Sequence, residues 1–358
     1  MSATQRTTFP YTLTRAGVVM SPEPGDDLEA EGVLNPASGR STDGELYLLP
    51  RLVAHGNVSR VGLAKVRIED GVPVGVQREG VVLSPDQGWE RGYEHAGVED
   101  PRTTWVPGLG LHLMTYVAYG PLGPRIALAV SADLRKWRRL GPVHFGYQPD
   151  LGTDLNLFPN KDAVFFPVPV PGPDGQPSYA MLHRPMWNLS WVRPGAGVHL
   201  PADLADARPG IWVSFVDAAE VEADIRMLVR MGEHRLVALP QYQWESLKIG
   251  AGPPPVRVGE GWLLLHHGVD GELDEGFTLQ PRASYAAGAM LLDGDDVTRV
   301  LGRSETPLLA PETIGERIGT VPNVVFPTAI EEIDGIRYVF YGMADTRIGV
   351  ARLDRIWP

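Results

Sequence analysis

Cysteine is absent from the 358-residue sequence, which excludes disulfide bonds and zinc sites built on cysteine thiolates. No apolar run approaches the roughly 18 residues of a membrane-spanning helix, and the N-terminus lacks the apolar core of a secretory signal peptide. Lysine and arginine number 32 against 44 aspartates and glutamates, for a net charge of −12. This balance argues against binding to nucleic acid or to an anionic membrane. We therefore expect a cytoplasmic protein with no nucleic-acid or membrane partner.

Helical periodicity is also scarce. Only Ala218 to Met231 shows the i, i+3, i+4 spacing of an amphipathic helix. The sequence instead contains 41 glycines and 33 prolines, with 43% hydrophobic residues. This composition is typical of a globular protein made of many short strands joined by tight turns.

Two kinds of strand-like segment recur in pairs about every 65–85 residues. The first kind begins at Leu46 (LYLL), Leu111 (LHLMTY), Tyr179 (YAML), Trp262 (WLLL) and Tyr338 (YVFY). The second kind follows a turn and begins at Ser59 (SRVGLA), Arg125 (RIALAVS), Ile211 (IWVSF), Tyr285 (YAAGAMLL) and Arg347 (RIGVA). Five repeated hairpins predict an all-β protein, a five-bladed β-propeller that forms a single domain over residues 1–358.

The interval between the third and fourth hairpins is the longest. We therefore predict that Ala218 to Met231 forms a short helical insertion between blades three and four. A pair of β-sandwiches is the main alternative, and the lack of a linker-like change in composition at mid-chain disfavours it.

Polar residues gather at the edges of the hairpins. In a propeller such edges meet in one funnel, so residues far apart in sequence can share a site. The candidates are Arg51, Arg60, Asp100, Lys161, Asp162, His183, Arg184, Lys248, His266, His267 and Asp345. Taken singly, Arg51 and Arg60 are each better explained as ordinary ion-pair partners. Strand alternation directs His266 and His267 to opposite faces, so at least one is expected to be a packing residue.

Two familiar kinds of site are not supported. The segment KIGAG around Lys248 lacks the spacing and the strand-to-helix context of a phosphate-binding P-loop. No group of histidines and carboxylates has metal-ligand spacing, so we expect no metal site. A carboxylic acid beside fixed cations instead suits general-acid cleavage of a glycosidic bond, with phosphate or water attacking the opposite face of the sugar.

Ten segments, in order along nearly the whole chain, resemble glycoside hydrolase family 130, the inverting β-mannoside phosphorylases and β-mannosidases. They are LNPASG, SRVGLA, VEDPR, RIALAVSADLRKW, NKDAVFFP, MLHRP, KIGAGPPPV, GWLLLHHGV, VPNVVFPTAI and YGMADTRIGVA. The resemblance implies a five-bladed β-propeller, in agreement with the repeat count.

The resemblance also implies roles for individual residues. Asp100 of VEDPR matches the general acid, which in the phosphorylases is thought to act through a sugar hydroxyl. Pro101 is expected to hold this carboxylate in place, while Glu99 points away or supports it. The positions that match phosphate contacts are Arg60, Lys248 and His267, together with Lys161 and Arg184. Those that match the mannose subsite are Asn35, Arg51 and Asp345.

The leading hypothesis is an inverting phosphorylase that converts a β-mannoside oligosaccharide and phosphate into α-mannose 1-phosphate, without a cofactor. The second is a β-mannosidase, in which Glu245 activates water. A third, from another class, is a sugar-binding propeller without activity, which the retained Asp100 disfavours. The linkage, the acceptor and the oligomeric state stay open, and a homo-oligomer is compatible with the sequence.

Overall fold

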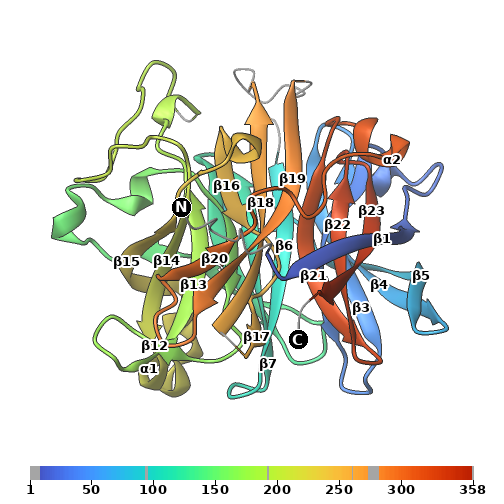
Figure 1. The fold of residues 1–358 in the computed structure, drawn as a ribbon, viewed down its shortest axis with the longest axis horizontal. Coiled ribbons are helices and arrows are strands. Elements are labelled where there is room, and N and C mark those ends of the chain that lie inside the picture. Colours follow the sequence, from blue (N-terminus) through green and yellow to red (C-terminus); the bar gives the residue numbers. More distant parts are fainter. Residues whose placement is uncertain (1–8, 93–95, 192, 260, 273–281, 357–358) are drawn as a thin grey trace, which may run out of the picture.

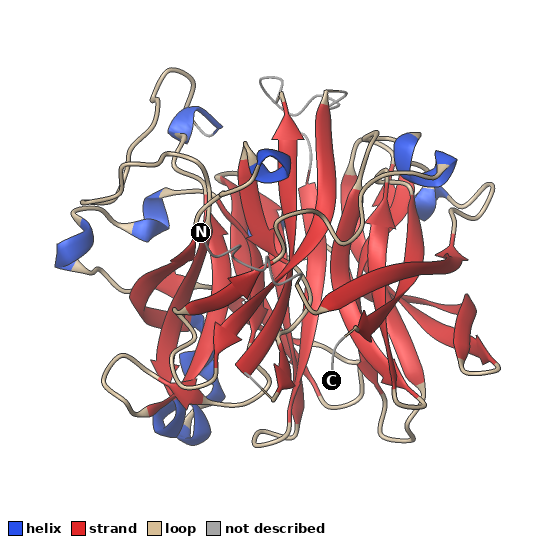
Figure 2. Cartoon of the chain, viewed as in Figure 1, coloured by secondary structure: helices blue, strands red, loops and turns tan. Residues whose placement is uncertain are grey.

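Strands make up most of the computed structural model, which describes residues 9–92, 96–191, 193–259, 261–272 and 282–356. The long strands run through the middle of the molecule, and short helices lie at its periphery (Figures 1 and 2). The all-β class is confirmed. No helix in these ranges is long and apolar enough to cross a membrane.

The strands of the described residues form four sheets, and Figure 1 labels many of these strands. The eight-stranded sheet contains β2 (Gly32–Arg40), β3 (Leu46–Ala54), β4 (Val58–Glu69), β5 (Val72–Leu83), β6 (Ala96–Val106), β7 (Leu111–Gly120), β8 (Gly123–Ser131) and β9 (Arg138–Pro142). The six-stranded sheet contains β10 (His144–Phe145), β11 (Asn160–Phe165), β12 (Val170–Pro171), β13 (Pro177–Pro185), β14 (Ile211–Asp217) and β15 (Arg230–Ala238).

The five-stranded sheet contains β16 (Lys248–Ala251), β17 (Val256–Val258), β18 (Gly261–Gly271), β19 (Ala283–Asp293) and β20 (Val300–Arg303). The four-stranded sheet contains β21 (Val325–Ile333), β22 (Ile336–Met343), β23 (Arg347–Arg355) and β1 (Tyr11–Met20). Because β1 pairs antiparallel with β23, the two ends of the chain complete one sheet. The two α-helices of the described residues are α1 (Ala218–Ala223) and α2 (Ile314–Arg317).

The eight-stranded sheet consists of two antiparallel halves, β2 to β5 and β6 to β9. Only a short parallel pairing joins them, where Val58 and Ser59 of β4 lie opposite Ala96 and Gly97 of β6. Within each half, successive strands pair as antiparallel neighbours. The main strands of the other three sheets repeat this antiparallel order.

The continuous apolar runs of the sequence are strands buried on both faces. In β3, Leu46 and Leu48 pack into one hydrophobic cluster, whereas Tyr47 and Leu49 pack into another. Successive side chains of a strand point to opposite faces, so a strand between two cores needs apolar residues at every position. The runs in β13, β18 and β22 divide between two clusters in the same way.

Five hydrophobic clusters of the described residues connect neighbouring strand groups in a closed series. One joins β3 and β4 to β7 and β8, and the next joins β7 and β8 to β13 and β14. Two more connect β13 and β14 to β18 and β19, and these to β22 and β23. The last joins β22 and β23 back to β3. The core is therefore a ring of interfaces with no free end.

The first strands of the groups lie inside this ring. β2 contacts β6 and β21, β6 contacts β11, and β11 contacts β16. β6 also contacts β21, which belongs to a group that is not its neighbour along the chain. Side chains from distant parts of the sequence therefore meet around the first strands.

The expected helix over Ala218 to Met231 is shorter and placed differently than predicted. The helix α1 ends at Ala223, because Asp224 has φ −150° and its side chain caps a following 3₁₀ turn, Ile225–Val229. Met231 already belongs to β15. Because β14 and β15 pair with each other, the insertion lies within one sheet and not between the third and fourth strand groups.

Candidate active site

Three polar side chains project from bulges near the beginnings of the first strands. Asn35 in β2, Asp100 in β6 and Asp162 in β11 have positive φ angles of 42°, 45° and 55°. The strand register shifts at each of these positions. Asn and Asp tolerate this left-handed conformation better than most residues, and bulges commonly redirect side chains next to active sites. The bulges thus give these three residues comparable positions on neighbouring strands.

The Asp100 carboxylate is held on one oxygen. Asn35 Nδ2 donates to Oδ1 at 2.8 Å, and Arg51 Nη1 donates to the same oxygen at 3.1 Å. The side chain is only 9% exposed. The backbone is fixed as well, because Arg102 Nη1 donates to the Asp100 carbonyl at 3.0 Å. Asp100 is therefore a positioned group and not a solvated loop residue.

Glu99 supports this arrangement through the same Arg51 side chain. It accepts a hydrogen bond from Arg51 Nη2 at 2.8 Å and one from Lys161 Nζ at 3.3 Å. Arg51 also donates through Nε to Ser59 Oγ at 2.8 Å. One guanidinium therefore joins both acids of the VEDPR segment.

The two aspartates of this region have opposite pKa shifts. Burial alone raises the pKa of Asp100, but attraction to Arg51 and Lys161 outweighs burial and leaves that pKa below its ordinary value. Burial raises the pKa of Asp345 to about 6, and repulsion from Asp100 adds to the rise. At neutral pH the free protein therefore carries an ionised Asp100. Asp345, in the turn after β22, is the carboxyl that holds a proton more readily.

A second group of side chains surrounds Asp162. Its Oδ2 accepts a hydrogen bond from Arg184 Nε at 2.5 Å and lies 3.4 Å from His267 Nε2. Burial keeps the pKa of His267 well below its ordinary value, so this imidazole is neutral. Gly250 permits the approach, because a Cβ there would lie 2.1 Å from Asp162 Oδ2 and 2.5 Å from His267 Cε1.

This second group has more cationic hydrogen-bond donors than anionic partners. Arg184 Nη1 and Arg102 Nη2 are buried and have no hydrogen-bond partner among the described residues. Lys248 lies at the start of β16, with Nζ 5.4 Å from the centre of the Tyr285 ring. Burial lowers the pKa of Lys248 to about 7, and repulsion from Arg184 contributes. A bound anion would weaken the repulsion between Lys248 and Arg184 and would accept hydrogen bonds from the unpaired donors.

The two groups adjoin each other. Arg102 contacts the Asp100 backbone, and its charge also interacts with Asp162. Lys161, which pairs with Glu99, contributes to the electrostatic field at Lys248. We call the two groups together the bulge site: Asn35, Arg51, Glu99, Asp100, Arg102, Lys161, Asp162, Arg184, Lys248, His267 and Asp345.

The structure brings most of the predicted site residues together. In contrast, no described contact joins Arg60 to the bulge site. Arg60 follows Ser59 on β4, and alternation directs it to the other face of the strand. Its Nη1 is buried without a hydrogen-bond partner among the described residues. The phosphate role of Arg60 stays a prediction.

Both carboxylate oxygens of Glu245 contact neighbouring side chains or backbone, which indicates a structural role. Its Oε1 lies 2.8 Å from His266 Nε2, and its Oε2 lies 2.8 Å from Arg303 and accepts the backbone N–H of Gln241 at 3.0 Å. The side chain is fully buried, and these partners outweigh burial to lower its pKa to about 2. His266 and His267 thus point to opposite faces of β18, as alternation predicted, but both are buried.

Sequence reasoning gave no role to Arg102 and Asp162. Asp162 of NKDAVFFP was among the candidates without an assigned role, and Arg102 of VEDPR was not selected. A signal was present, since LNPA, EDPR and KDAV each place Asn or Asp where the strand register later proves to shift. Among the described residues, no group of three or more His, Asp and Glu side chains is arranged to hold a metal ion.

The chain belongs to glycoside hydrolase family 130. The sequence model of this family, described as beta-1,4-mannooligosaccharide phosphorylase, matches residues 32–356. The chain is 30% identical over 344 residues to a 1,2-beta-oligomannan phosphorylase of Thermoanaerobacter sp. (strain X514), covering 94% of both chains. It is 43% identical over 122 residues to a beta-1,4-mannooligosaccharide phosphorylase of Ruminococcus albus, which covers 34% of each chain.

A solved structure of Listeria innocua beta-1,2-mannobiose phosphorylase has the same fold. It superposes with a TM-score of 0.70 at 21% identity and covers 97% of both chains. A solved structure from a study of family 130 glycoside hydrolases that target beta-1,2 mannosidic linkages in Candida mannan has the same TM-score and identity, over 98% of this chain and 95% of that one.

Proposed function

We propose that this protein is an inverting β-mannoside phosphorylase. The observation that carries the proposal is the pairing of a positioned carboxylate, Asp100, with an adjoining excess of buried cationic donors from Lys248, Arg184 and Arg102. Such donors suit a phosphate ion, whose charge needs fixed cations, and they have no evident use if water is the nucleophile. The relatives named as mannoside phosphorylases support this choice.

In the proposed reaction, a phosphate oxygen attacks C1 of the terminal mannose from the face opposite the leaving group. The C1–O bond to the acceptor sugar breaks as the C1–O bond to phosphate forms, and a proton passes to the departing oxygen. Direct displacement inverts the anomeric centre, so a β-mannoside gives α-mannose 1-phosphate. We assign His267 a positioning role beside the phosphate, because its imidazole is neutral and its Nε2 lies 3.4 Å from Asp162 Oδ2.

Asp100 is the proposed source of the proton, either directly or through a sugar hydroxyl. It is ionised in the free protein, so it has to gain its proton in the complex. A bound mannoside excludes water and a phosphate adds negative charge, and both effects raise the pKa of a carboxylate. We assign Asn35, Arg51 and Asp345 to the mannose subsite around it.

A hydrolase mechanism needs a carboxylate base that is free to activate water. Glu245 does not meet this need, because His266, Arg303 and a backbone amide occupy both of its oxygens.

We also propose a cytoplasmic location, because inorganic phosphate is abundant there.

We further propose that the chain forms one domain, a five-bladed β-propeller, whose blades are β2 to β5, β6 to β9, β10 to β15, β16 to β20, and β21 to β23 together with β1. The closed series of five hydrophobic clusters and the contacts among the first strands support this arrangement. In such a ring the bulges of β2, β6 and β11 lie near one mouth of the central channel.

The stereochemistry of the product tests the proposal. Proton and phosphorus NMR of a reaction with β-mannobiose and phosphate should show α-mannose 1-phosphate from the first time points. A β-configured sugar phosphate would contradict direct displacement. Free mannose in clear excess over mannose 1-phosphate from the first time points would contradict phosphorolysis, which releases the two in equal amounts.

A further inference from the structure

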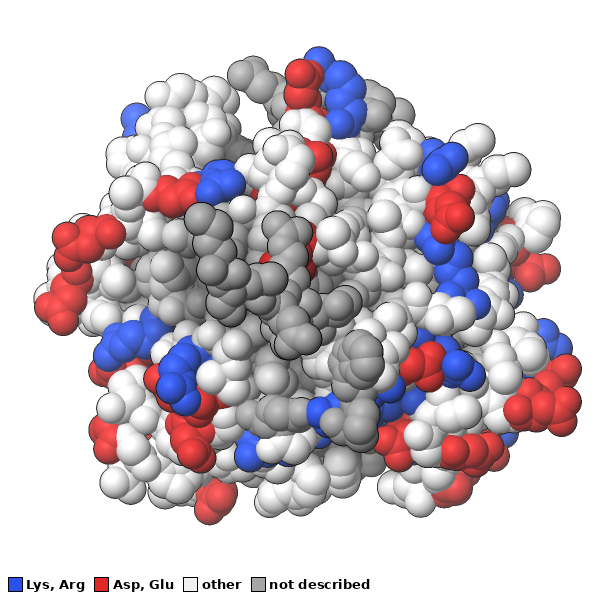
Figure 3. All heavy atoms as spheres, viewed as in Figure 1, with Lys and Arg blue, Asp and Glu red and all other residues white. Residues whose placement is uncertain are grey.

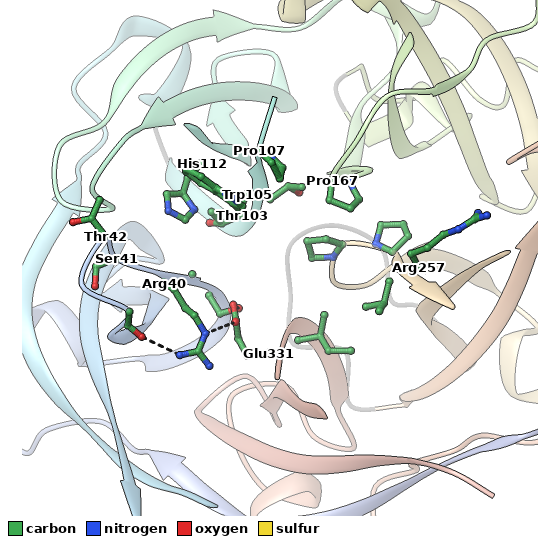
Figure 4. Close-up of a pocket in the computed structure, with 18 of the residues that line it drawn as sticks. Arg40, Ser41, Thr42, Thr103, Trp105, Pro107, His112, Pro167, Arg257 and Glu331 are labelled. Carbon is green, nitrogen blue, oxygen red and sulfur yellow. Dashed lines mark hydrogen bonds and ion pairs between the residues drawn. The ribbon is translucent and has the colours of Figure 1, made fainter. Parts of the chain in front are cut away.

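A cavity of about 760 Å³ opens at the other end of the first strands. It is lined by Arg40 from β2, Trp105 from β6, Pro254 after β16 and Glu331 from β21, among others. Figure 4 shows these side chains around one space, with Trp105, Thr103 and His112 together on one side and Glu331 facing them from another strand. Its volume lies in the range of small-molecule sites.

This cavity is separate from the bulge site. Trp105 follows Asp100 by five positions on β6, which corresponds to about 17 Å along an extended strand. Between them lie Arg102 and Thr104, only 1% and 2% exposed. Arg102 Nε donates to the Gly252 carbonyl at 3.1 Å, and the Thr104 hydroxyl donates to the Phe165 carbonyl at 3.2 Å. Buried, hydrogen-bonded side chains therefore separate the two openings.

One wall of the cavity offers a flat apolar surface. Trp105 is 45% exposed, unusually open for so large an apolar side chain. Its ring centre lies 4.7 Å from that of His112, at an angle of 52°, so the His112 ring supports it from one side. Pro167, Pro254 and Pro255 add rigid apolar surface. An exposed indole held in this way is a platform for the C–H face of a ring.

The polar groups of the cavity include both donors and acceptors. Glu331 accepts a hydrogen bond from Ser38 Oγ at 2.7 Å, and its other oxygen lies 3.8 Å from Arg40 Nε. Thr103 Oγ1 and His112 Nδ1 are buried and have no hydrogen-bond partner among the described residues. The two residues are only 5% and 3% exposed. Unpaired buried polar atoms are rare in proteins and suggest a ligand that pairs with them.

We propose that this cavity is a second carbohydrate site, which binds one pyranose ring of a neutral oligosaccharide without cleaving it. A pyranose has an apolar C–H face for Trp105 and a rim of hydroxyls that both donate and accept, as Glu331, Arg40 and Thr103 require. Arg40 and Glu331 neutralise each other, which disfavours a charged ligand. The proposal rests on this chemistry and not on the assigned reaction, although a manno-oligosaccharide is the natural probe.

Fluorine NMR of protein labelled with 5-fluorotryptophan tests the proposal directly. The chain has nine tryptophans, and Trp105→Ala identifies the Trp105 signal by its loss. Titration with β-1,4-mannotriose in phosphate-free buffer should shift that signal saturably. The same shift, with the same affinity, should occur in the Asn35→Ala variant, which weakens saccharide binding in the proposed mannose subsite and so excludes transmission from the active site. A Trp105 signal that stays unmoved at tens of millimolar trisaccharide in both proteins overturns the proposal.

Two further variants separate binding from folding. Thr103→Val keeps the side-chain shape but removes the unpaired hydroxyl, and should weaken the Trp105 titration by about 3- to 10-fold. Trp105→Ala should keep turnover of β-mannobiose within about twofold of the wild type, as should Tyr147→Ala, which removes an aromatic residue 67% exposed elsewhere. A changed oligomeric state in Trp105→Ala by light scattering, with no saccharide-induced shift in the wild type, would identify the cavity as a protein interface and overturn the saccharide site.

Discussion

At the scale of single residues, the chemistry depends on how neighbours set the charge of Asp100. Arg51, Lys161 and Arg102 favour its ionised form strongly enough to overcome burial. A general acid that is ionised at rest can work only if substrate binding returns its proton. The same ion pairs therefore position the carboxylate in the free protein and delay its protonation until the complex forms.

Replacing Asp100 by Asn tests this role. Asn cannot supply a proton, so kcat should fall by about 10²- to 10⁴-fold, the usual contribution of general acid catalysis. Mannoside affinity, measured by calorimetry without phosphate, should change little. Asp150→Asn, an exposed site, is the matched control. Near-normal turnover of Asp100→Asn removes this residue from the mechanism.

Lys248 links phosphate affinity to pH. Its pKa of about 7 in the free protein means that its charge is lost as the pH rises through neutrality, whereas bound phosphate favours the charged form. Between about pH 7.5 and about pH 9, the KM for phosphate should therefore rise with pH in the wild type. Lys248→Ala should raise this KM by about 10- to 100-fold at neutral pH, since a charge-assisted bond contributes about 1.5–3 kcal/mol.

The same variant should also lose most of the pH dependence of KM over that range. Initial-rate measurements at saturating mannoside provide both values. Lys136→Ala removes an exposed lysine elsewhere and should behave as the wild type. An unchanged phosphate KM in Lys248→Ala removes Lys248 from the phosphate site.

At the scale of strands, the site depends on irregular first strands. Bulges at Asn35, Asp100 and Asp162 project polar side chains, and Gly250 on β16 leaves space for Asp162 and His267. These strands break the patterns by which strands are recognised, because they contain Pro, Gly, Asn and Asp at the functional positions.

Gly250→Ala tests this packing. Its methyl group would meet the Asp162 carboxylate at 2.1 Å and the His267 ring at 2.5 Å, so the pair has to separate. We expect the phosphate KM to rise by at least about tenfold and the melting temperature to fall by several degrees. Gly302→Ala on β20 has no atom within 4 Å of the new Cβ and should change neither. Wild-type phosphate affinity in Gly250→Ala contradicts the proposed phosphate position.

The same irregularity explains what the sequence can and cannot predict. The middle strands, such as LYLL and WLLL, are buried on both faces, so their apolar runs predict them well. The amphipathic pattern from Ala218 to Met231 was misleading, because a short helix, a 3₁₀ turn and a strand can direct Val221, Leu228 and Met231 into one core.

Side-chain partners are harder to predict than strands. Glu245 and Lys161 are both charged and each lies within three residues of a site residue, Lys248 or Asp162. Glu245 nevertheless pairs with His266 and Arg303, whereas Lys161 pairs with Glu99. The Lys161 pairing joins two strand groups, and the Glu245 pairings join the turn before β16 to β18 and β20 of the same sheet. They depend on the three-dimensional packing of the groups, which a pattern along one chain does not contain.

At the scale of the whole molecule, the closed series of hydrophobic cores forms a ring, and the first strands inside it run between the two opposite openings of that ring. The bulge site lies near the start of the first strands, and the 760 Å³ cavity lies near their ends. Acidic and basic side chains are interspersed over the face in Figure 3, so the cationic donors of the bulge site are a local feature in a protein of net charge −12. The concentration of cationic donors at the bulge site, against this negative net charge, supports a dedicated anion site there.

The most direct test is to incubate the protein with β-1,2- and β-1,4-mannobiose, with and without phosphate, and to quantify the products. With phosphate present, the proposed function predicts equal amounts of mannose 1-phosphate and of mannose released as the acceptor sugar, with almost no further mannose. Without phosphate, it predicts negligible cleavage. Cleavage of either mannobiose to two free mannoses at equal rates in phosphate-free buffer would contradict it.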